Sequence, residues 1–159
     1  MMNRLFVVFL AIVLLICPEA QAQLQKAPDI IGADTAGSFV SLYSMKQKTI
    51  LIMFWSADCE TCKEHISDLI NLCGIYKKKQ FGMFTFCISP DESAWKELIS
   101  VFHGCGVHLV GLDGAVEPIL LSWNLTEVPS FALINSKREI VASSRSFKAI
   151  LPAVNEWVH

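Results

Sequence analysis

A continuous apolar run, TILIMFW at residues 49–55, is separated by three residues from a C-x-x-C pair, Cys59 and Cys62. The run mixes β-branched and aromatic residues without polar ones between them, which is typical of a strand buried on both faces of a sheet. Beyond the pair, apolar side chains recur at helical spacing, at Ile66, Leu69, Ile70 and Cys73. The sequence therefore predicts a dithiol at the first turn of a helix that follows a buried strand.

The rest of the chain alternates between strand and helix patterns. We predict further strands over residues 38–43, 82–89, 130–135 and 139–143, and further helices after a capping Asp91 and over residues 115–123 and 147–158. Gly74 is a natural end for the helix after the dithiol, and the glycine-rich residues 103–114 read as a connection. This order predicts an α/β sandwich around a mixed sheet.

The N-terminus has the pattern of an export signal. Arg4 precedes an apolar run over residues 5–16, and Ala20 and Ala22 supply the small residues of a cleavage site. The run is shorter than the ~20 residues of a membrane span, although a core helix or an uncleaved anchor remains the alternative. We expect residues 1–22 to be a signal peptide and residues 23–159 to form one domain. The protein would then reside in the periplasm or cell envelope and meet the membrane only through its export signal.

Charge and cysteine content argue against two classes of function, nucleic-acid binding and a purely structural use of the cysteines. The chain carries 13 basic and 15 acidic residues, so nothing in its charge predicts a nucleic-acid partner. Without Cys17, an odd number of cysteines remains, namely Cys59, Cys62, Cys73, Cys87 and Cys105. An odd number of cysteines cannot all pair in disulfides within the chain, and a domain of this size does not need a disulfide to be stable. A purely structural role for the cysteines is therefore disfavoured.

The spacing of the dithiol suits thiol–disulfide exchange. A helix N-terminus favours a thiolate on Cys59, and Cys62, one turn further on, can resolve a mixed disulfide formed there. Asp58 and Glu60 place negative charge on both sides of Cys59, against the helix dipole and Lys63. A less stabilised thiolate makes a less oxidising couple, so we expect reducing or isomerase-like exchange.

A metal site is the alternative use of the dithiol, in a binding module rather than an enzyme. Structural zinc sites also use C-x-x-C but normally need a second pair, and the nearby candidate ligands are His65, His103, Cys105 and His108. Such spacings arise easily by chance in a glycine-rich segment, so we predict neither a metal nor a cofactor.

The remaining cysteines and histidines have simpler interpretations. We expect His103 and His108 to lie on a loop surface. Cys73 and Cys87 are expected to be small core hydrophobes, because each falls among apolar neighbours. Cys105 is left open, either free or paired.

Three motifs in order resemble one family. WSADCETCK, from Trp55 to Lys63, resembles the W-x-x-x-C-x-x-C-[KR] signature of thioredoxin-fold proteins. Ala27-Pro28-Asp29 and Val128-Pro129-Ser130 are similar to the A-P and V-P-[TS] motifs of the exported TlpA/ResA-like branch. The resemblance covers nearly all of the mature chain. It implies a thioredoxin fold with a central insertion and an N-terminal extension, protein thiol or disulfide substrates, and an electron donor that the sequence does not identify.

The resemblance also implies roles around the dithiol. Val128 and Pro129 would hold a partner chain, with a cis peptide bond between them that lies against the two cysteines. Trp55 would belong to the apolar surround of the site, although plain core packing explains it equally well. The chain also departs from the family pattern. Asp58 replaces the usual aromatic before the first cysteine, and Thr61 replaces the proline common between the two cysteines. Residues 49–55 contain no acidic residue, and His65 and Ser67 stand where the branch often has Glu and Pro. We therefore expect the usual early kink of the helix to be missing.

Overall fold

A mixed seven-stranded sheet organises the computed structural model, which describes residues 23–89, 91–112 and 114–158. The predicted signal peptide lies outside these residues. The strands are β1 (Ile31–Ala33), β2 (Phe39–Ser41), β3 (Thr49–Trp55), β4 (Phe81–Cys87), β5 (Val107–Val110), β6 (Ser130–Ile134) and β7 (Ile140–Ser144). The helices are η1 (Leu42–Ser44), α2 (Glu60–Glu64), α3 (Ile66–Tyr76), α4 (Glu92–Ile99), η2 (Ser100–Phe102), α5 (Val116–Ser122) and α6 (Phe147–Trp157). The strand order is β2-β1-β5-β4-β3-β6-β7.

Strand β3 lies at the centre of the sheet and is buried along its whole length, as its apolar sequence predicts. It pairs in parallel with β4 and antiparallel with β6, so both of its edges are also covered.

No helix among the described residues is long and apolar enough to span a membrane.

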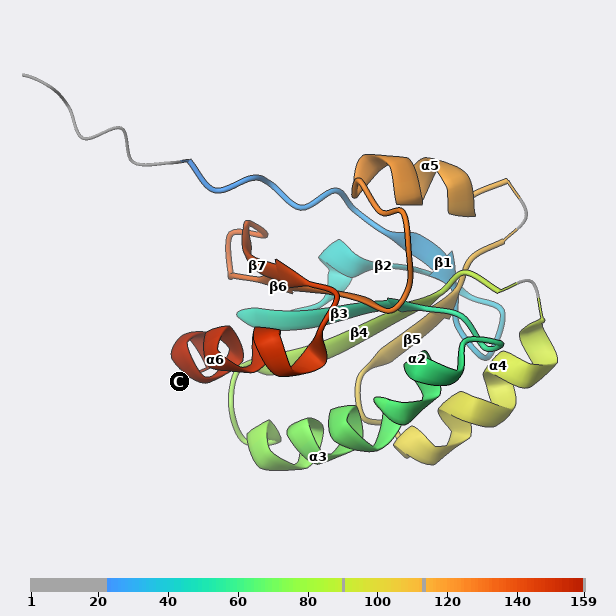
Figure 1. Cartoon of the computed structure of the whole chain (residues 1–159), viewed down its shortest axis with the longest axis horizontal. Coiled ribbons are helices and arrows are strands. Elements are labelled where there is room, and N and C mark those ends of the chain that lie inside the picture. Colours follow the sequence, from blue (N-terminus) through green and yellow to red (C-terminus); the bar gives the residue numbers. More distant parts are fainter. Residues whose placement is uncertain (1–22, 90, 113, 159) are drawn as a thin grey trace, which may run out of the picture.

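Helices cover both faces of the sheet, which confirms the predicted α/β sandwich (Figure 1). On one face, alternate side chains of β3 such as Met53 and Trp55 pack with α2, α3, α4 and α6. On the other face, Ile52 and Phe54 pack with Trp123, at the end of α5. The segment before β1 and the short helix η1 belong to the same apolar cluster. The sheet thus separates two apolar clusters, and the dithiol belongs to the first.

Two strands were not expected from the sequence. β5 lies inside the glycine-rich segment predicted to be a connection, and β1 precedes the predicted strand over residues 38–43. β5 spans four residues and β1 three. Strands this short, next to turn residues, do not show a recognisable alternation of apolar and polar side chains. β5 is held by parallel pairing with β4, and β1 joins the sheet antiparallel to β5.

The helix after the dithiol differs from the prediction at both ends. The expected uninterrupted start is wrong, because α2 ends at Glu64 and α3 begins at Ile66. His65 stands at the break with a ψ of −6°, and its ring packs against Phe131 and Phe147. The aromatic contacts hold the chain at the break without the proline seen in the family.

Gly74 does not end α3, which continues to Tyr76. Glycine within a helix costs only about 1 kcal/mol relative to alanine, so tertiary contacts can override it. The last turn is held by Tyr76, whose ring packs against Phe81 and whose hydroxyl donates to Asn155 Oδ1 at 2.5 Å.

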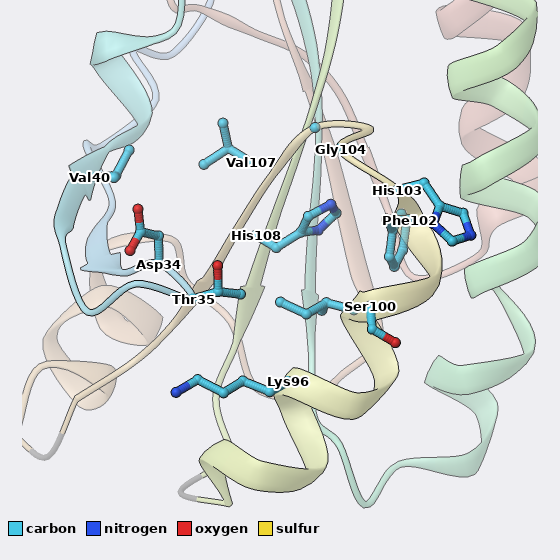
Figure 2. A pocket seen from close by; sticks show the side chains of 12 residues that line it. Asp34, Thr35, Val40, Lys96, Ser100, Phe102, His103, Gly104, Val107 and His108 are labelled. Atoms are coloured by element: carbon cyan, nitrogen blue, oxygen red, sulfur yellow. The ribbon is translucent and has the colours of Figure 1, made fainter.

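His108 is a structural residue of β5 rather than a loop-surface residue, which corrects the prediction (Figure 2). Its Nδ1 lies 2.9 Å from Thr85 Oγ1 and its Nε2 lies 2.8 Å from the carbonyl oxygen of Cys105. Because a carbonyl only accepts, Nε2 carries the proton and Nδ1 accepts from the threonine hydroxyl. This neutral tautomer satisfies both nitrogens, and burial lowers the pKa of His108.

Acidification is expected to destabilise the fold through His108. An unfolded histidine has a pKa of about 6.5, above that of folded His108, so between the two values the unfolded chain binds more protons. The free energy of unfolding should therefore decrease as pH falls through this window, by about 1.4 kcal/mol for each unit between the two pKa values. Urea denaturation at about pH 7.5 and about pH 5 measures the change.

His108→Gln is the matched variant, since its amide can both donate and accept but does not titrate. Its loss of stability on acidification should be smaller than that of the wild type. Equal losses in the two proteins would show that His108 does not contribute.

Candidate active site

Cys59 and Cys62 form a disulfide at the start of α2, with Cα atoms 5.2 Å apart. Cys59 is the N-cap residue, and its Sγ accepts a hydrogen bond from the Cys62 amide at 3.2 Å. In the reduced state, this N–H and the helix dipole would favour a thiolate on Cys59. The predicted position of the dithiol, after a buried strand and at a helix start, is confirmed.

The two sulfur atoms differ in access. Cys59 is half-buried, whereas Cys62 is fully buried, with 0% of its surface exposed. A partner molecule can therefore reach Cys59 and not Cys62. This asymmetry supports the predicted roles of Cys59 as attacking thiol and Cys62 as resolving thiol.

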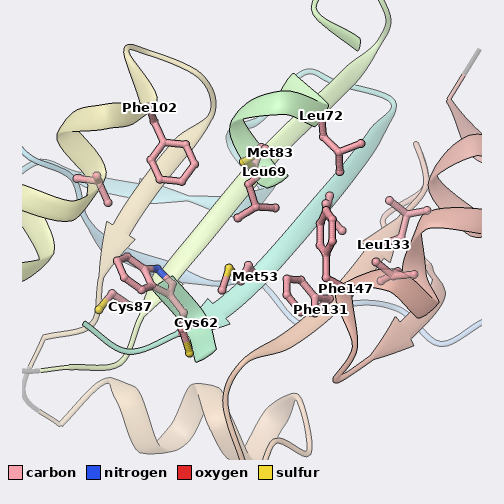
Figure 3. Close-up of a cluster of buried hydrophobic side chains, with 14 of the residues drawn as sticks. Met53, Cys62, Leu69, Leu72, Met83, Cys87, Phe102, Phe131, Leu133 and Phe147 are labelled. Atoms are coloured by element: carbon pink, nitrogen blue, oxygen red, sulfur yellow. The ribbon is translucent and has the colours of Figure 1, made fainter. Parts of the chain in front are cut away.

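Beneath the disulfide lies the first apolar cluster, in which Cys62 packs with side chains of β3, β4 and α3 (Figure 3). Trp55 belongs to this cluster and is only 2% exposed, which favours core packing over direct contact with a partner. Cys87 is paired in register with Trp55 and is fully buried, as predicted for a small core hydrophobe. Burial raises the pKa of the Cys87 thiol and keeps it protonated.

The loop before β6 lies against the disulfide. The Val128–Pro129 peptide bond is cis, and the carbonyl oxygen of Val128 lies 4.0 Å from Cys59 Sγ. Val128 and Pro129 are half-buried and Val128 packs against both apolar clusters. The backbone of this loop is thus close enough to Cys59 to contact a molecule bound there.

The charges around Cys59 are mostly negative. Asp58 is exposed, and a hydrogen bond from the Ser56 hydroxyl is the main cause that lowers the pKa of its carboxyl group. Glu60 forms an ion pair with Lys63, with Oε1 and Nζ 2.7 Å apart, which offsets the lysine charge. Asp58 forms no ion pair within the described part of the chain. A carboxylate without an ion-pair partner therefore stands next to the accessible cysteine.

The structure shows two links between distant residues that the sequence did not predict. Arg145, after β7, forms an ion pair with Glu127, the residue before Val128. Cys73 forms a disulfide with Cys105, with Cα atoms 6.2 Å apart, so the prediction that Cys73 is a core hydrophobe is wrong. The sequence left Cys105 open between free and paired, and no pattern in it pointed to Cys73 as the partner; two disulfides and the buried Cys87 account for the five cysteines from Cys59 to Cys105.

These contacts also bear on the alternative of metal capture. Cys105 is in a disulfide, and both ring nitrogens of His108 are hydrogen-bonded, so neither side chain is free to coordinate. Within the described residues, no group of three or more His, Cys, Asp or Glu side chains is arranged to hold a metal ion. The metal-binding alternative is therefore not favoured.

Comparisons with known proteins agree on one class. The family model named Redoxin matches residues 22–148. The thioredoxin domain of a thiol-disulfide oxidoreductase from Bacteroides vulgatus is 26% identical, with a TM-score of 0.78 over 85% of this chain and 96% of that one. A thiol:disulfide interchange protein from a Bacteroides species is 26% identical, with a TM-score of 0.76 over 86% and 90% of the two chains. A thiol-disulfide oxidoreductase from Bacteroides fragilis, at 20% identity and a TM-score of 0.73 over 83% and 98%, shares the fold. No curated protein matches the chain significantly.

Proposed function

The chain belongs to the Redoxin family, and we propose that this thiol–disulfide oxidoreductase is exported and reduces or isomerises disulfides of other proteins through Cys59 and Cys62. The observation that carries the proposal is the asymmetry of the dithiol. An accessible cysteine caps a helix, a fully buried cysteine lies behind it, and the Val128 carbonyl lies 4.0 Å from the outer sulfur.

The reaction starts from the reduced protein. The Cys59 thiolate attacks one sulfur of a partner disulfide, and the other partner sulfur leaves as a thiolate that takes up a proton from solvent. Cys62 then loses its proton and attacks Cys59 Sγ in the mixed disulfide, which releases the second partner thiol. Two electrons have passed to the partner, and the Cys59–Cys62 disulfide remains, as in the structure. A donor dithiol must then return two electrons to this disulfide.

The loop at Val128 and Pro129 is proposed to align the partner chain. The Val128 carbonyl can accept a hydrogen bond from the backbone of an extended peptide, in the manner of strand addition. Such a contact would hold the partner disulfide beside Cys59 without requiring any particular sequence around it. Protein thiols and disulfides are therefore the proposed substrates.

Export is proposed from the N-terminal pattern, with residues 1–22 as a cleaved signal and residues 23–159 as the mature domain in the periplasm or cell envelope. An oxidising compartment is also where the Cys73–Cys105 disulfide would persist.

One experiment tests both parts of the proposal. The full-length Cys62→Ser variant, with a C-terminal tag, is expressed in a Gram-negative host and captured from the envelope fraction after thiols are alkylated. It should carry mixed disulfides with other proteins through Cys59, because the resolving thiol is missing. N-terminal sequencing of the same material should start within a few residues of Gln23.

Cys59→Ser is the matched control and should capture far fewer partners. Capture of partners through Cys62 instead would reverse the roles of the two thiols. Purified protein that still contains residues 5–16 would contradict cleavage of the signal peptide.

The direction of exchange is proposed from Asp58. Its ionised carboxylate disfavours the Cys59 thiolate, so Asp58→Asn should lower the pKa of Cys59 by roughly 0.3–1 unit. The reduction potential of the dithiol should rise by up to about 30 mV for each unit of that shift. Equilibration with glutathione or dithiothreitol buffers gives the potential, and pH-dependent alkylation gives the pKa.

Glu156→Gln, an exposed substitution on α6, is the control for removal of one negative charge far from the dithiol. A potential that is unchanged or lower in Asp58→Asn would remove the support for a reducing role.

A further inference from the structure

The Cys73–Cys105 disulfide lies in a surface hollow of about 330 Å³. Both cysteines line this hollow and both are half-buried, so the bond can be reached from solvent. It joins the last turns of α3 to the loop before β5. The bond thus lies at the edge of the first apolar cluster, against which both cysteines pack, rather than inside it.

The loop that carries Cys105 is open to solvent on one side. His103, Gly104 and Gly106 have positive φ angles of 47°, 78° and 96°. A Cβ built on Gly104 would meet nothing within 4 Å, and a second hollow of about 570 Å³ lies on the other side of the loop, toward His108 (Figure 2). On the other side of Cys105 the loop is packed against β4, since a Cβ on Gly106 would meet the Met83 carbonyl oxygen at 2.8 Å. An incoming thiol would therefore approach the Cys105 sulfur from the open side at Gly104.

Positive charge lies beside this second disulfide, at the end of α3. Lys77 lies one helical turn beyond Cys73 and lines the same hollow, and Lys78 and Lys79 follow it. These lysines form no ion pairs within the described residues, and no carboxylate lines the hollow there. The Cys59–Cys62 disulfide has the opposite surroundings, with an unpaired Asp58 beside the accessible sulfur.

We propose that Cys73–Cys105 is a second thiol–disulfide exchange site, which reacts preferentially with anionic thiols. Cys73 lies eleven residues after Cys62 on the broken helix α2–α3, a separation of about 16 Å along the axis, so the two sites cannot exchange directly within one molecule. Each site would therefore react with its own class of thiol.

The reaction consumes two thiols. One thiolate attacks Cys105 Sγ, the Cys73–Cys105 bond breaks, and Cys73 leaves as a thiolate that Lys77 stabilises. A second thiolate attacks the external sulfur of the mixed disulfide and frees Cys105. The two external thiols are oxidised to their disulfide, and Cys73 and Cys105 are reduced by two electrons and take two protons from solvent.

The test compares small thiols of different charge: 2-mercaptoethanesulfonate, 2-mercaptoethanol and 2-mercaptoethylamine at matched thiolate concentration. The oxidised full chain is treated with each thiol and quenched by alkylation, and mass spectrometry gives the reduction rate of each disulfide separately. At low salt, the anionic thiol should reduce Cys73–Cys105 about 2- to 5-fold faster than the cationic thiol, and high salt should abolish the difference. The Cys59–Cys62 disulfide, measured in the same samples, should show the reverse order.

Lys77→Gln should bring the anionic-to-cationic rate ratio at Cys73–Cys105 toward one, whereas Lys137→Gln, on the exposed β6–β7 turn, should leave it unchanged. If Cys73–Cys105 is reduced only in denaturant, the proposal of an exchange site is wrong and the disulfide is purely structural. Equal rates with all three thiols, or a ratio insensitive to Lys77→Gln, would overturn the preference for anionic thiols.

Discussion

Cys59→Ser is expected to lower turnover in a protein-disulfide reduction assay by about 10³-fold or more. The reason is chemical, because a serine hydroxyl stays protonated at neutral pH and does not attack a disulfide sulfur. The nearby thiols cannot substitute for it, since Cys62 and Cys87 are both fully buried. Insulin reduction followed by turbidity, with dithiothreitol as electron donor, measures the rate.

Cys87→Ala is the matched control for loss of a thiol. Cys87 lies in the core, opposite Trp55 in register, and takes no part in the exchange, so turnover should stay within about twofold of the wild type when the variant is folded. Turnover by Cys59→Ser above about a tenth of the wild-type rate would refute the assignment of Cys59 as the attacking thiol.

Removal of the Cys73–Cys105 disulfide should reduce the free energy of unfolding by about 3.5 kcal/mol. The bond closes a loop across a sequence separation of 32 residues, and its loss restores that loop's freedom in the unfolded chain. Urea denaturation of the Cys73→Ala/Cys105→Ala protein, followed by circular dichroism with Cys59–Cys62 kept oxidised, measures the change. The m-value should rise slightly, because the unfolded chain without this cross-link is less compact and exposes more surface.

The single variants sharpen this test. Cys73→Ala and Cys105→Ala each break the same covalent link, so each should cost about as much as the double variant rather than half of it. Wild-type protein reduced selectively at this bond should lose a similar amount. A loss below about 1 kcal/mol would mean that other contacts, such as the His108 hydrogen bond to the Cys105 carbonyl, already hold the loop.

Features that depend on neighbouring residues in the sequence were predictable. The run over residues 49–55 is strand β3, and Cys59 caps the helix that follows it. Asp91 caps α4 as predicted, with its carboxylate accepting from the Ala94 amide at 3.0 Å. A buried strand, a cap and a helical face each leave a pattern within a few residues, because the backbone itself sets their periods.

Features that join distant segments were not predictable from one sequence. Strand β5 exists because β4 offers it a parallel edge, and its own four residues carry too little pattern to predict a strand. The tertiary structure also decided which cysteines pair, since the five cysteines from Cys59 to Cys105 allow many pairings and only the packing of α3 against the loop before β5 brings Cys73 to Cys105. The sequence by itself determined that a dithiol stands at a helix start. The tertiary structure decided what surrounds it, because the contact of Cys59 with Val128, like the Cys73–Cys105 bond, forms only when segments far apart in the chain meet in the folded protein.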